Sequence, residues 1–293
     1  MKFLGTAAFC CCMMLGTCGA SPPSFTYDAF APLEYEVDSS ATDAGVETSA
    51  VSFRSGSTLL HAILVSPDKP GGAMPGVLFV HWLGDPTTSN DREFLPDAEW
   101  LARRGVVSLL PDEPWSRPDW FDKIRSTKTD AADAVSTVVA LRRCLDVLEK
   151  TPGVDPKRLA YVGHDLGAMY GALVAGADVR PSWFVFMAPT VTFAQWFLSD
   201  STLSAPERAD YVAQMSAFDV RSSLSRANFS GTLAQFAAHD SYVSVGDARA
   251  FAQALPVGDR TVKTYDTTHA LQVDAATDDR RVWLGKRLGL TAL

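Results

Sequence analysis

The sequence of 293 residues predicts an α/β domain built on a mostly parallel central sheet, with helices on both faces. Continuous apolar runs, such as Gly76 to His81, are typical of strands buried on both faces, and segments of helical period follow them. This alternation of strand and helix continues along most of the chain, as expected for parallel strands joined by helical crossovers. With 47% hydrophobic and 20% charged residues, the chain can fill one large core, so we expect one domain over residues 51–293.

The first half of this domain contains predicted strands and two predicted helices. β-Branched and aromatic runs, separated by turn residues, predict strands at Val51 to Phe53, Leu59 to Val65, Gly76 to His81 and Val106 to Leu110. A helical period predicts a helix from Asp91 to Arg104, which Gly105 ends. A long amphipathic pattern predicts a second helix over about 129–150, which ends at Pro152-Gly153.

The second half repeats the alternation. Apolar runs predict strands at Leu159 to Val162, Trp183 to Met187, Thr232 to Ala237 and Thr261 to Tyr265. Helical patterns follow at Leu166 to Ala175, Gly246 to Leu255 and Asp278 to Leu288.

The alternation is interrupted between about residues 190 and 231. This stretch is rich in Phe, Trp, Ser and Asp and contains only helical fragments. A connection of this length is usually functional, so we expect a modest cap insertion over the carboxyl edge of the sheet. Its aromatic residues Phe193, Trp196 and Tyr211, together with His81 after an earlier strand, are the candidates for the walls of a substrate pocket.

The first twenty residues have a different composition from the rest. Lys2 precedes an apolar run that is too short for a membrane span, which predicts a signal peptide over residues 1–20. Small residues before Cys18 resemble a bacterial lipobox, so we expect lipidation at Cys18. Residues 21–50 are then a linker and N-terminal segment. The protein is expected to be exported, as a membrane lipoprotein or as a periplasmic or secreted protein.

The charge and the cysteines narrow the possible partners. The net charge is -8 and the pI is near 5.1, and the sequence contains no run of Lys and Arg that would follow a phosphate backbone. We therefore expect no nucleic-acid partner. After processing at Cys18 only Cys144 remains, within a helical pattern where a buried small hydrophobic residue is expected. No metal-ligand cluster is visible. We therefore expect a small-molecule substrate and no cofactor.

Three polar residues follow three predicted strands. Asp165 follows the first of these strands and is framed by Gly163 and Gly167, Asp240 follows the second, and His269 follows the third. The carboxyl ends of parallel strands share one crevice, so these side chains are expected to converge. A nucleophile, then an acid, then a histidine is the chain order of a hydrolytic triad, with Asp165 in the central position of a GxSxG-type turn.

With these three residues in this order, the sequence resembles the α/β-hydrolase fold over nearly all of residues 50–293. The segments Val162-Gly-His-Asp-Leu-Gly-Ala168, His239-Asp-Ser-Tyr-Val243 and Tyr265-Asp-Thr-Thr-His269 are similar to the dienelactone-hydrolase-like branch. The Gly-His-Asp core also resembles haloalkane dehalogenases and epoxide hydrolases, whose nucleophile is an aspartate. The chain departs from both patterns, because Leu166 stands where dehalogenases have a tryptophan and the insertion offers only one tyrosine.

The chemistry of a carboxylate nucleophile favours a saturated carbon. Attack on an ester would give an anhydride, whereas attack on a carbon bearing a halide or a strained oxygen gives a stable alkyl-enzyme ester at Asp165. His269, oriented by Asp240, would activate the water that hydrolyses this ester. The backbone N–H groups of Leu166 and Trp82 are the expected oxyanion donors.

The preferred hypothesis is therefore an exported hydrolase acting on a small, mainly apolar electrophile. Two alternatives remain open. One is a dienelactone-hydrolase-like ester or lactone hydrolase, in which Asp165 is a base or an electrostatic group. The other is a catalytically inactive lipoprotein of the same fold that binds a ligand.

Overall fold

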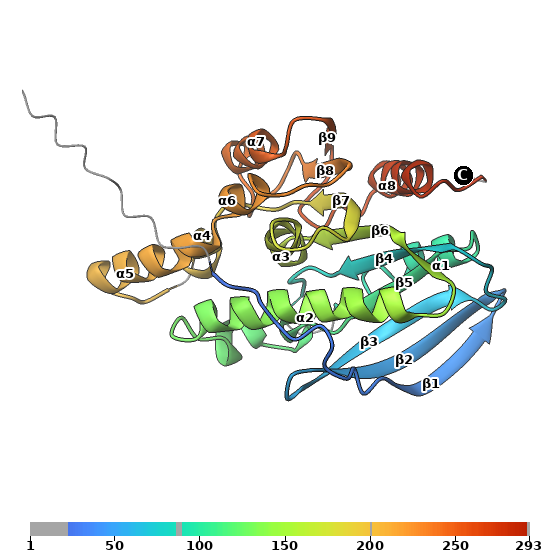
Figure 1. Ribbon diagram of the computed structural model, residues 1–293. Helices are drawn as coiled ribbons and strands as arrows, with labels where there is room; N and C mark the ends of the chain where they lie inside the picture. The colour runs from blue at the N-terminus through green and yellow to red at the C-terminus, as the bar shows by residue number, and fades with distance from the viewer. Residues whose placement is uncertain (1–22, 86–89, 200, 292–293) are drawn as a thin grey trace, which may run out of the picture.

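The computed structural model describes residues 23–85, 90–199 and 201–291. The predicted signal peptide and Cys18 lie outside the described residues. The protein forms a nine-stranded sheet in the order β1-β2-β3-β5-β4-β6-β7-β8-β9 (Figure 1). The strands are β1 Glu36–Asp43, β2 Val46–Ser55, β3 Thr58–Pro67, β4 Met74–Val80, β5 Val107–Pro111, β6 Val154–His164, β7 Pro181–Met187, β8 Gly231–Ala237 and β9 Asp259–Tyr265.

The sheet combines an antiparallel edge with a parallel body. The pairs β1–β2, β2–β3 and β3–β5 are antiparallel, whereas β5, β4, β6, β7, β8 and β9 pair in parallel. β4 is buried along its whole length, as its continuous apolar run predicts. The predicted α/β class and the mostly parallel sheet are confirmed.

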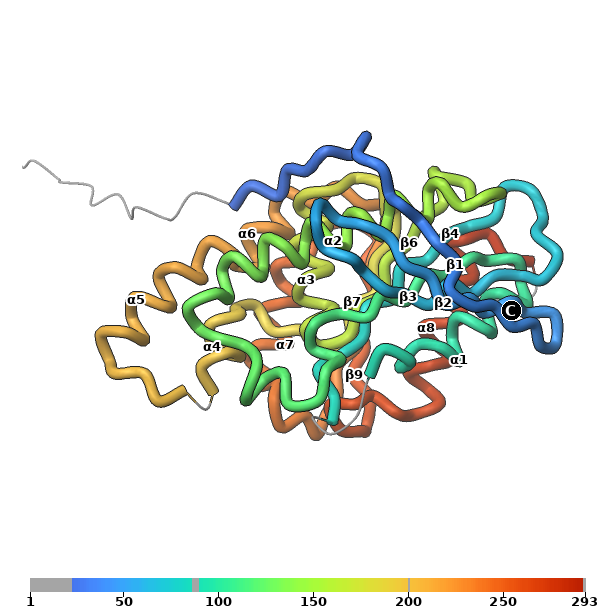
Figure 2. The backbone as a smooth tube through the Cα atoms, turned by 90° about the horizontal axis from the view of Figure 1, so that it is seen from below, coloured from blue at the N-terminus to red at the C-terminus, as the bar shows by residue number. Residues whose placement is uncertain are grey.

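Helices cover both faces of the sheet. α2 and α3 pack on one face, and α1 and α8 pack beside each other on the opposite face (Figures 1 and 2). The long helices are α1 Leu95–Ala102, α2 Asp130–Lys150, α3 Leu166–Ala175, α5 Ala205–Met215, α7 Val245–Ala254 and α8 Asp274–Arg287. The short ones are η1 Pro114–Ser116, η2 Trp120–Ile124, α4 Phe193–Phe197, η3 Ser216–Phe218 and α6 Val220–Leu224.

The sheet begins earlier in the chain than the sequence indicates. β1 and the start of β2 lie within residues 21–50, which the sequence analysis assigns to a linker and N-terminal segment. All eight residues of β1 are exposed, and most are Ser, Asp, Glu or Thr. Such a strand has no apolar face, so it lacks the alternation by which strands are recognised. The ordered domain therefore extends toward the N-terminus beyond the predicted boundary at residue 51.

The predicted insertion between β7 and β8 consists of four helical segments, α4, α5, η3 and α6. Figures 1 and 2 show α5 at one end of the molecule, beyond α4. A capping box starts α5, because Ser204 and Glu207 bind each other's backbone N–H groups. The inner side of this segment is apolar and buried, with Phe193, Phe197 and Met215 in the core.

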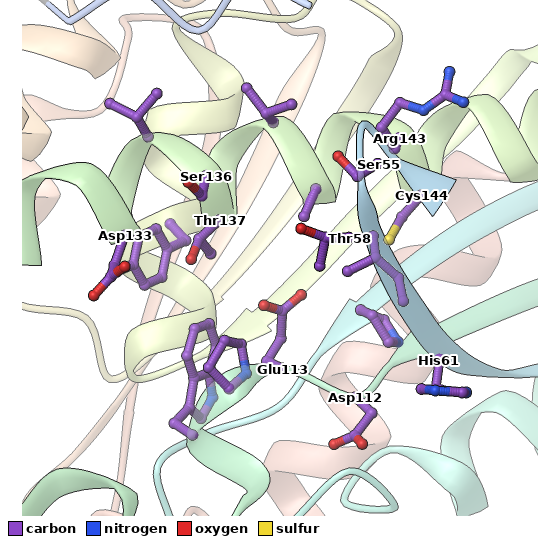
Figure 3. Close-up of a pocket in the computed structure, with 18 of the residues that line it drawn as sticks. Ser55, Thr58, His61, Asp112, Glu113, Asp133, Ser136, Thr137, Arg143 and Cys144 are labelled. Carbon is purple, nitrogen blue, oxygen red and sulfur yellow. The ribbon is translucent and has the colours of Figure 1, made fainter. Parts of the chain in front are cut away.

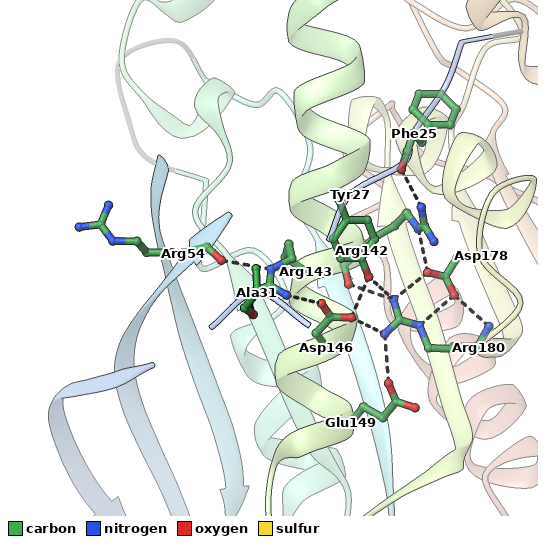
Figure 4. A network of polar contacts seen from close by, with 10 residues as sticks. All are labelled: Phe25, Tyr27, Ala31, Arg54, Arg142, Arg143, Asp146, Glu149, Asp178 and Arg180. Atoms are coloured by element: carbon green, nitrogen blue, oxygen red, sulfur yellow. Dashed lines mark hydrogen bonds and ion pairs between the residues drawn. The ribbon is translucent and has the colours of Figure 1, made fainter. Parts of the chain in front are cut away.

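A polar network fixes the N-terminal segment to α2 (Figure 4). Arg142 donates to the backbone oxygen of Phe25 over 2.7 Å, and Tyr27 donates to Asp146 over 2.8 Å. Arg143, which is 2% exposed, donates to Asp146 and to the backbone oxygens of Ala31, Pro32 and Arg54. The N-terminal segment from Phe25 to Pro32 is therefore attached to the body of the domain.

Two smaller observations concern the described residues only. Within them, none of the helices has the length and apolar character needed to cross a membrane. Cys144 in α2 is a free, buried thiol, and burial raises its pKa well above the usual range. This environment is consistent with the small buried residue that the sequence predicts there.

Candidate active site

The turn between β6 and α3 places Asp165 in a strained conformation. Its φ is 52° and its ψ is -114°, in a region that L residues rarely adopt. A Cβ atom on Gly163 would lie 2.3 Å from the backbone oxygen of Gly167, and one on Gly167 would lie 2.2 Å from the backbone oxygen of Val80. Both positions therefore require glycine, and the turn has the geometry of a nucleophile elbow.

The structure brings Asp165, Asp240 and His269 together at the carboxyl edge of the sheet. His269 Nδ1 lies 2.8 Å from Asp240 Oδ2, and His269 Nε2 lies 3.9 Å from Asp165 Oδ1. The other oxygen of Asp240 accepts hydrogen bonds from the amides of Tyr242 and Val243, both at 2.8 Å. Asp240 therefore holds the His269 ring, and the proton on Nδ1 leaves Nε2 free to act toward Asp165.

A backbone amide binds the carboxylate of Asp165. The Leu83 N–H donates to Oδ2 over 3.1 Å, and the amide of Leu166, the next residue, also acts to lower the pKa of this carboxyl group. The prediction of Trp82 as a donor is wrong, because its N–H donates instead to Glu93 Oε2 over 2.9 Å. The loop after β4 supplies the donor as expected, but from the next residue, since successive amides of an extended loop point in different directions.

Glu93 connects this loop to the elbow. Besides binding the Trp82 amide, its Oε1 lies 2.6 Å from His164 Nδ1. The other nitrogen of His164 lies 3.0 Å from the backbone oxygen of His269. The Trp82 indole stacks on the His164 ring, with the centroids 5.1 Å apart and the planes 4° apart. Glu93 and His164 therefore position the donor loop and the His269 backbone without contacting the Asp165 carboxylate through a hydrogen bond.

The buried site shifts the pKa values of all three residues. Burial raises the pKa of Asp165 to about 6, although the charges of His269 and His164 and the two amides act in the opposite direction. Burial alone would lower the pKa of His269, but its hydrogen bond to Asp240 and the charge of Asp165 outweigh this effect and raise it. Burial of Asp240 is likewise outweighed by the hydrogen bonds it accepts, from His269 first, so its pKa is lowered.

Aromatic side chains surround His269. Trp196 of α4 lies on the ring with centroids 5.9 Å apart, and Tyr242 meets it edge-on at 5.0 Å. His269 Nε2 and Trp196 Nε1 are both buried, and neither has a hydrogen-bond partner among the described residues. Buried polar groups without partners carry a free-energy cost, so both are suited to bind a substrate.

The other candidate wall residues, Phe193, Tyr211 and His81, have their described partners outside the triad. Phe193 is buried against Tyr170 and Phe197. The hydroxyl of Tyr211 donates to Asp130 over 2.6 Å. The His81 ring is fixed between the Trp82 backbone oxygen and the Glu113 amide, and burial lowers its pKa. Their role in substrate binding stays a prediction.

Sequence reasoning missed Leu83, Glu93 and Tyr242. Tyr242 follows Asp240 by two residues, which is a spacing that a turn at Asp240 makes plausible. Glu93 belongs to no sequence motif, because its role depends on a tertiary hydrogen bond from the amide of Trp82, eleven residues earlier. Among the residues that the structure describes, no group of three or more His, Cys, Asp or Glu side chains is arranged to hold a metal ion.

Comparison with solved structures finds the same architecture in several enzymes. An acetyl xylan esterase from a Paenibacillus species has a TM-score of 0.70 at 18% identity, covering 87% of this chain and 89% of that chain. An acetyl xylan esterase from a Thermoanaerobacterium species has a TM-score of 0.69 at 14% identity, covering 87% and 88%. A protein described as a putative dienelactone hydrolase from Klebsiella pneumoniae has a TM-score of 0.62 at 15% identity, covering 83% and 98%.

Comparison with curated sequences finds similarity over part of the chain only. A polyketide transferase from Stachybotrys chlorohalonatus is 31% identical over 105 residues, which are 33% of this chain and 31% of that protein. The match thus spans about a third of the length of this curated relative. No family model matches the chain. The strand order, the elbow at Asp165 and the similarity over most of the chain to these solved structures together show that the protein has the α/β-hydrolase fold.

Proposed function

We propose that the protein is a hydrolase that opens a small, mainly apolar electrophile through an alkyl ester of Asp165. The observation that carries this proposal is the unequal environment of the two carboxylate oxygens. Oδ2 accepts the Leu83 N–H, whereas Oδ1 is directed to His269 Nε2 across 3.9 Å without a hydrogen bond. One oxygen is therefore held in the donor site, and the other is available as a nucleophile.

In the first step, Asp165 Oδ1 attacks a saturated carbon of the substrate. A C–O bond forms while the bond to the leaving group breaks, and the leaving group takes the bonding electrons. The product is an ester whose carbonyl oxygen is Oδ2. No proton moves in this step, so it requires only that Asp165 be ionised.

In the second step, His269 Nε2 takes a proton from water, and the resulting hydroxide attacks Cγ of the ester. The negative charge develops on Oδ2, which already accepts the Leu83 N–H, and the adjacent Leu166 N–H is the expected second donor. Collapse of this intermediate expels the alkoxide, which receives the proton from His269. Asp165 is regenerated as a carboxylic acid with one oxygen and one proton from water, and the product alcohol carries the former Oδ1. The Asp165 proton then passes to solvent when the leaving group is a halide, or to the alkoxide that an opened epoxide leaves, so that Asp165 is ionised again.

The leaving group needs its own stabilisation. The buried indole N–H of Trp196 has no partner in the described part of the chain, and its ring lies on His269. We assign it as the donor to a departing halide or oxygen anion. Replacement of Trp196 by Phe should then lower the rate of ester formation more than the rate of ester hydrolysis, as single-turnover measurements would show.

A second candidate is hydrolysis of an ester or lactone, with Asp165 as a base or an electrostatic group. The similar solved structures favour it, since they include two acetyl xylan esterases and a protein described as a putative dienelactone hydrolase. Against it, the Leu83 amide, which would stabilise a substrate oxyanion, is occupied by the Asp165 carboxylate. A substrate carbonyl would have to displace that carboxylate.

The deciding experiment traps the covalent intermediate. His269→Gln is incubated with alkyl halides, epoxides, lactones and activated esters, and its peptides are analysed by mass spectrometry. An adduct on Asp165 from a halide or an epoxide supports the proposal, and Asp165→Asn should abolish both adduct and turnover. The matched controls are His239→Gln and Asp266→Asn, an exposed pair in contact with each other at 2.6 Å.

The alternatives give different results. Turnover of esters or lactones without an adduct, and with activity partly kept in Asp165→Asn, would support the esterase candidate. Absence of adduct and of turnover across the whole panel would indicate an inactive protein that binds a ligand. In that case Asp165→Ser is expected to create esterase activity.

We also propose that the protein is exported and anchored through a lipid at Cys18. The support is the sequence before Cys18 together with the attachment of Phe25 and Tyr27 to the domain, which leaves only a short segment between the anchor and the fold. Mass spectrometry of the mature N-terminus in the native host tests this directly. A free N-terminus beyond Cys18 would replace the anchor by ordinary signal cleavage.

A further inference from the structure

A cavity lies beside the donor loop, apart from the triad. Its volume is about 960 Å³, and it is bounded by α2, by the turn between β2 and β3 and by the segment that follows β5 (Figure 3). Asp165, Asp240 and His269 are not among its lining residues. Aromatic side chains form a large part of its wall: Tyr27, Trp115, Trp120, Tyr170 and Phe197.

The carboxyl group of Glu113 points into this cavity (Figure 3). Glu113 is only 4% exposed, and its carboxyl group receives no hydrogen bond from the residues that the structure describes. Burial, assisted by the charge of Asp112, raises its pKa to about 8. A buried polar group without a partner costs free energy, and a ligand that supplies the partner would recover it.

The remaining charges of the lining favour a cation. Besides Glu113, the wall contains the carboxylates of Asp28, Asp112, Asp130 and Asp133.

Acidic side chains outnumber the arginines of the wall, of which there are three: Arg117, Arg125 and Arg143. Arg125 is paired with Asp130, although its buried Nε has no partner among the described residues, and Arg143 binds Asp146 at 2.7 Å and three backbone oxygens. Arg117 donates through Nε to the backbone oxygen of Pro114. An anionic ligand would therefore meet an excess of carboxyl groups, whereas a cation would find carboxylates and the faces of aromatic rings.

We propose that this cavity binds a small organic ammonium, with its charged nitrogen on Glu113 and its apolar body against the aromatic wall. The cavity is large enough for a ligand of drug-like size. The proposal is independent of the reaction assigned to Asp165.

The cavity is also connected to the donor loop. The Glu113 amide donates to His81 Nε2 over 3.3 Å, and the Trp115 indole donates to the His81 backbone oxygen over 3.1 Å. His81 directly precedes Trp82 and Leu83. A ligand that binds Glu113 therefore lies next to residues that hold the start of the donor loop.

The test compares three ligands of similar size by isothermal titration calorimetry: phenethylammonium, 2-phenylethanol and phenylacetate. The titrations are run above pH 8, where the Glu113 carboxyl, whose pKa is about 8, is largely ionised. We expect the ammonium to bind at least about tenfold more tightly than the other two, and Glu113→Gln to reduce its affinity at least about tenfold. Glu99→Gln, at an exposed ion pair with Arg103, is the matched control and should bind like the wild type.

A second variant separates this cavity from the triad. Asp165→Asn should bind the ammonium with unchanged affinity, because Asp165 does not line the cavity. Equal binding by the wild type and Glu113→Gln would overturn the proposal. Tighter binding of the alcohol or the carboxylate, or no binding of any of the three ligands, would also overturn it.

Discussion

The amide of Leu83 lies 3.1 Å from Oδ2 of Asp165, although the two residues are 82 positions apart in the chain. The contact joins the loop after β4 to the elbow after β6, two strands that are neighbours in the sheet. In this fold the loop donor usually faces a substrate oxygen. Here the Leu83 amide binds the carboxylate of Asp165 instead. An aspartate in this position therefore has one oxygen fixed before any substrate arrives.

The position of the Leu83 donor depends on Glu93. Glu93→Ala should lower kcat by about 100-fold, the effect of losing one oxyanion donor, because the Trp82 amide and His164 would both lose their partner. Glu93→Gln should retain more activity, since its amide oxygen still accepts from Trp82. The measurement is steady-state kinetics on the substrate that the trapping experiment identifies. A Glu93→Ala variant with unchanged kcat would show that the loop holds its position without this contact.

The proposed mechanism requires that activity rise with pH. Asp165 must be ionised to attack, and His269 must be neutral to take a proton from water. Burial raises the pKa of Asp165 to about 6, and the bond to Asp240 outweighs burial to raise that of His269. Both groups act in their deprotonated forms, so kcat/KM should increase as the pH rises through about 6, and it should keep rising above the ordinary histidine pKa of 6.5.

Asp240→Asn provides the check on this pH profile. Without the carboxylate, the pKa of His269 should fall, and kcat should drop by roughly 10²- to 10⁴-fold because the ring loses its orientation. A bell-shaped profile with a loss of activity just above neutral pH would instead indicate an essential protonated group, which the mechanism does not contain.

The elbow glycines should be essential for folding. Gly163→Ala would place a Cβ atom 2.3 Å from the Gly167 backbone oxygen, and backbone atoms cannot move as a flexible side chain does. We expect a loss of stability of about 1–3 kcal/mol or more, measured by urea unfolding. Gly72→Ala is the control, because nothing lies within 4 Å of its added Cβ. Equal stability of the two variants would be inconsistent with the close approach at the elbow.

Glu113 should make stability depend on pH. Its pKa is about 8 in the folded protein against an ordinary value of 4.5, so the folded state keeps a proton that the unfolded state loses. The stability from this group is complete below about pH 4.5 and is lost as the pH rises to about 8, by up to about 1.4 kcal/mol per pH unit. Glu113→Gln should show a weaker decline over this window in urea unfolding. An unchanged decline would mean that Glu113 ionises normally in the folded state.

Most of the fold and the convergence at the sheet edge could be predicted from the sequence. Buried strands and amphipathic helices have strong patterns, and the strand-end rule indicated that Asp165, Asp240 and His269 would meet. The identity of the loop donor, Leu83 rather than Trp82, depends on which way each amide points in an irregular loop. Sequence patterns do not specify that direction.

The cavity that contains Glu113 could not be predicted from sequence patterns either. Its residues come from the N-terminal segment, a hairpin turn, the end of β5 and one face of α2, and no spacing connects them. Within the sequence, Glu113 is one acidic residue among 34. Only the packing of α2 against the end of β5 makes it a buried carboxyl group without a partner.

The sequence analysis missed β1 because this strand has no apolar face. The same polar character makes β1 a suitable edge of the sheet. Its eight exposed residues include the acidic Glu36, Asp38 and Asp43, and its register with β2 shifts between Val37 and Ser39. Negative charges and a bulge on an outer strand prevent a second chain from adding its own strand there. The strand therefore protects the molecule from edge-to-edge aggregation.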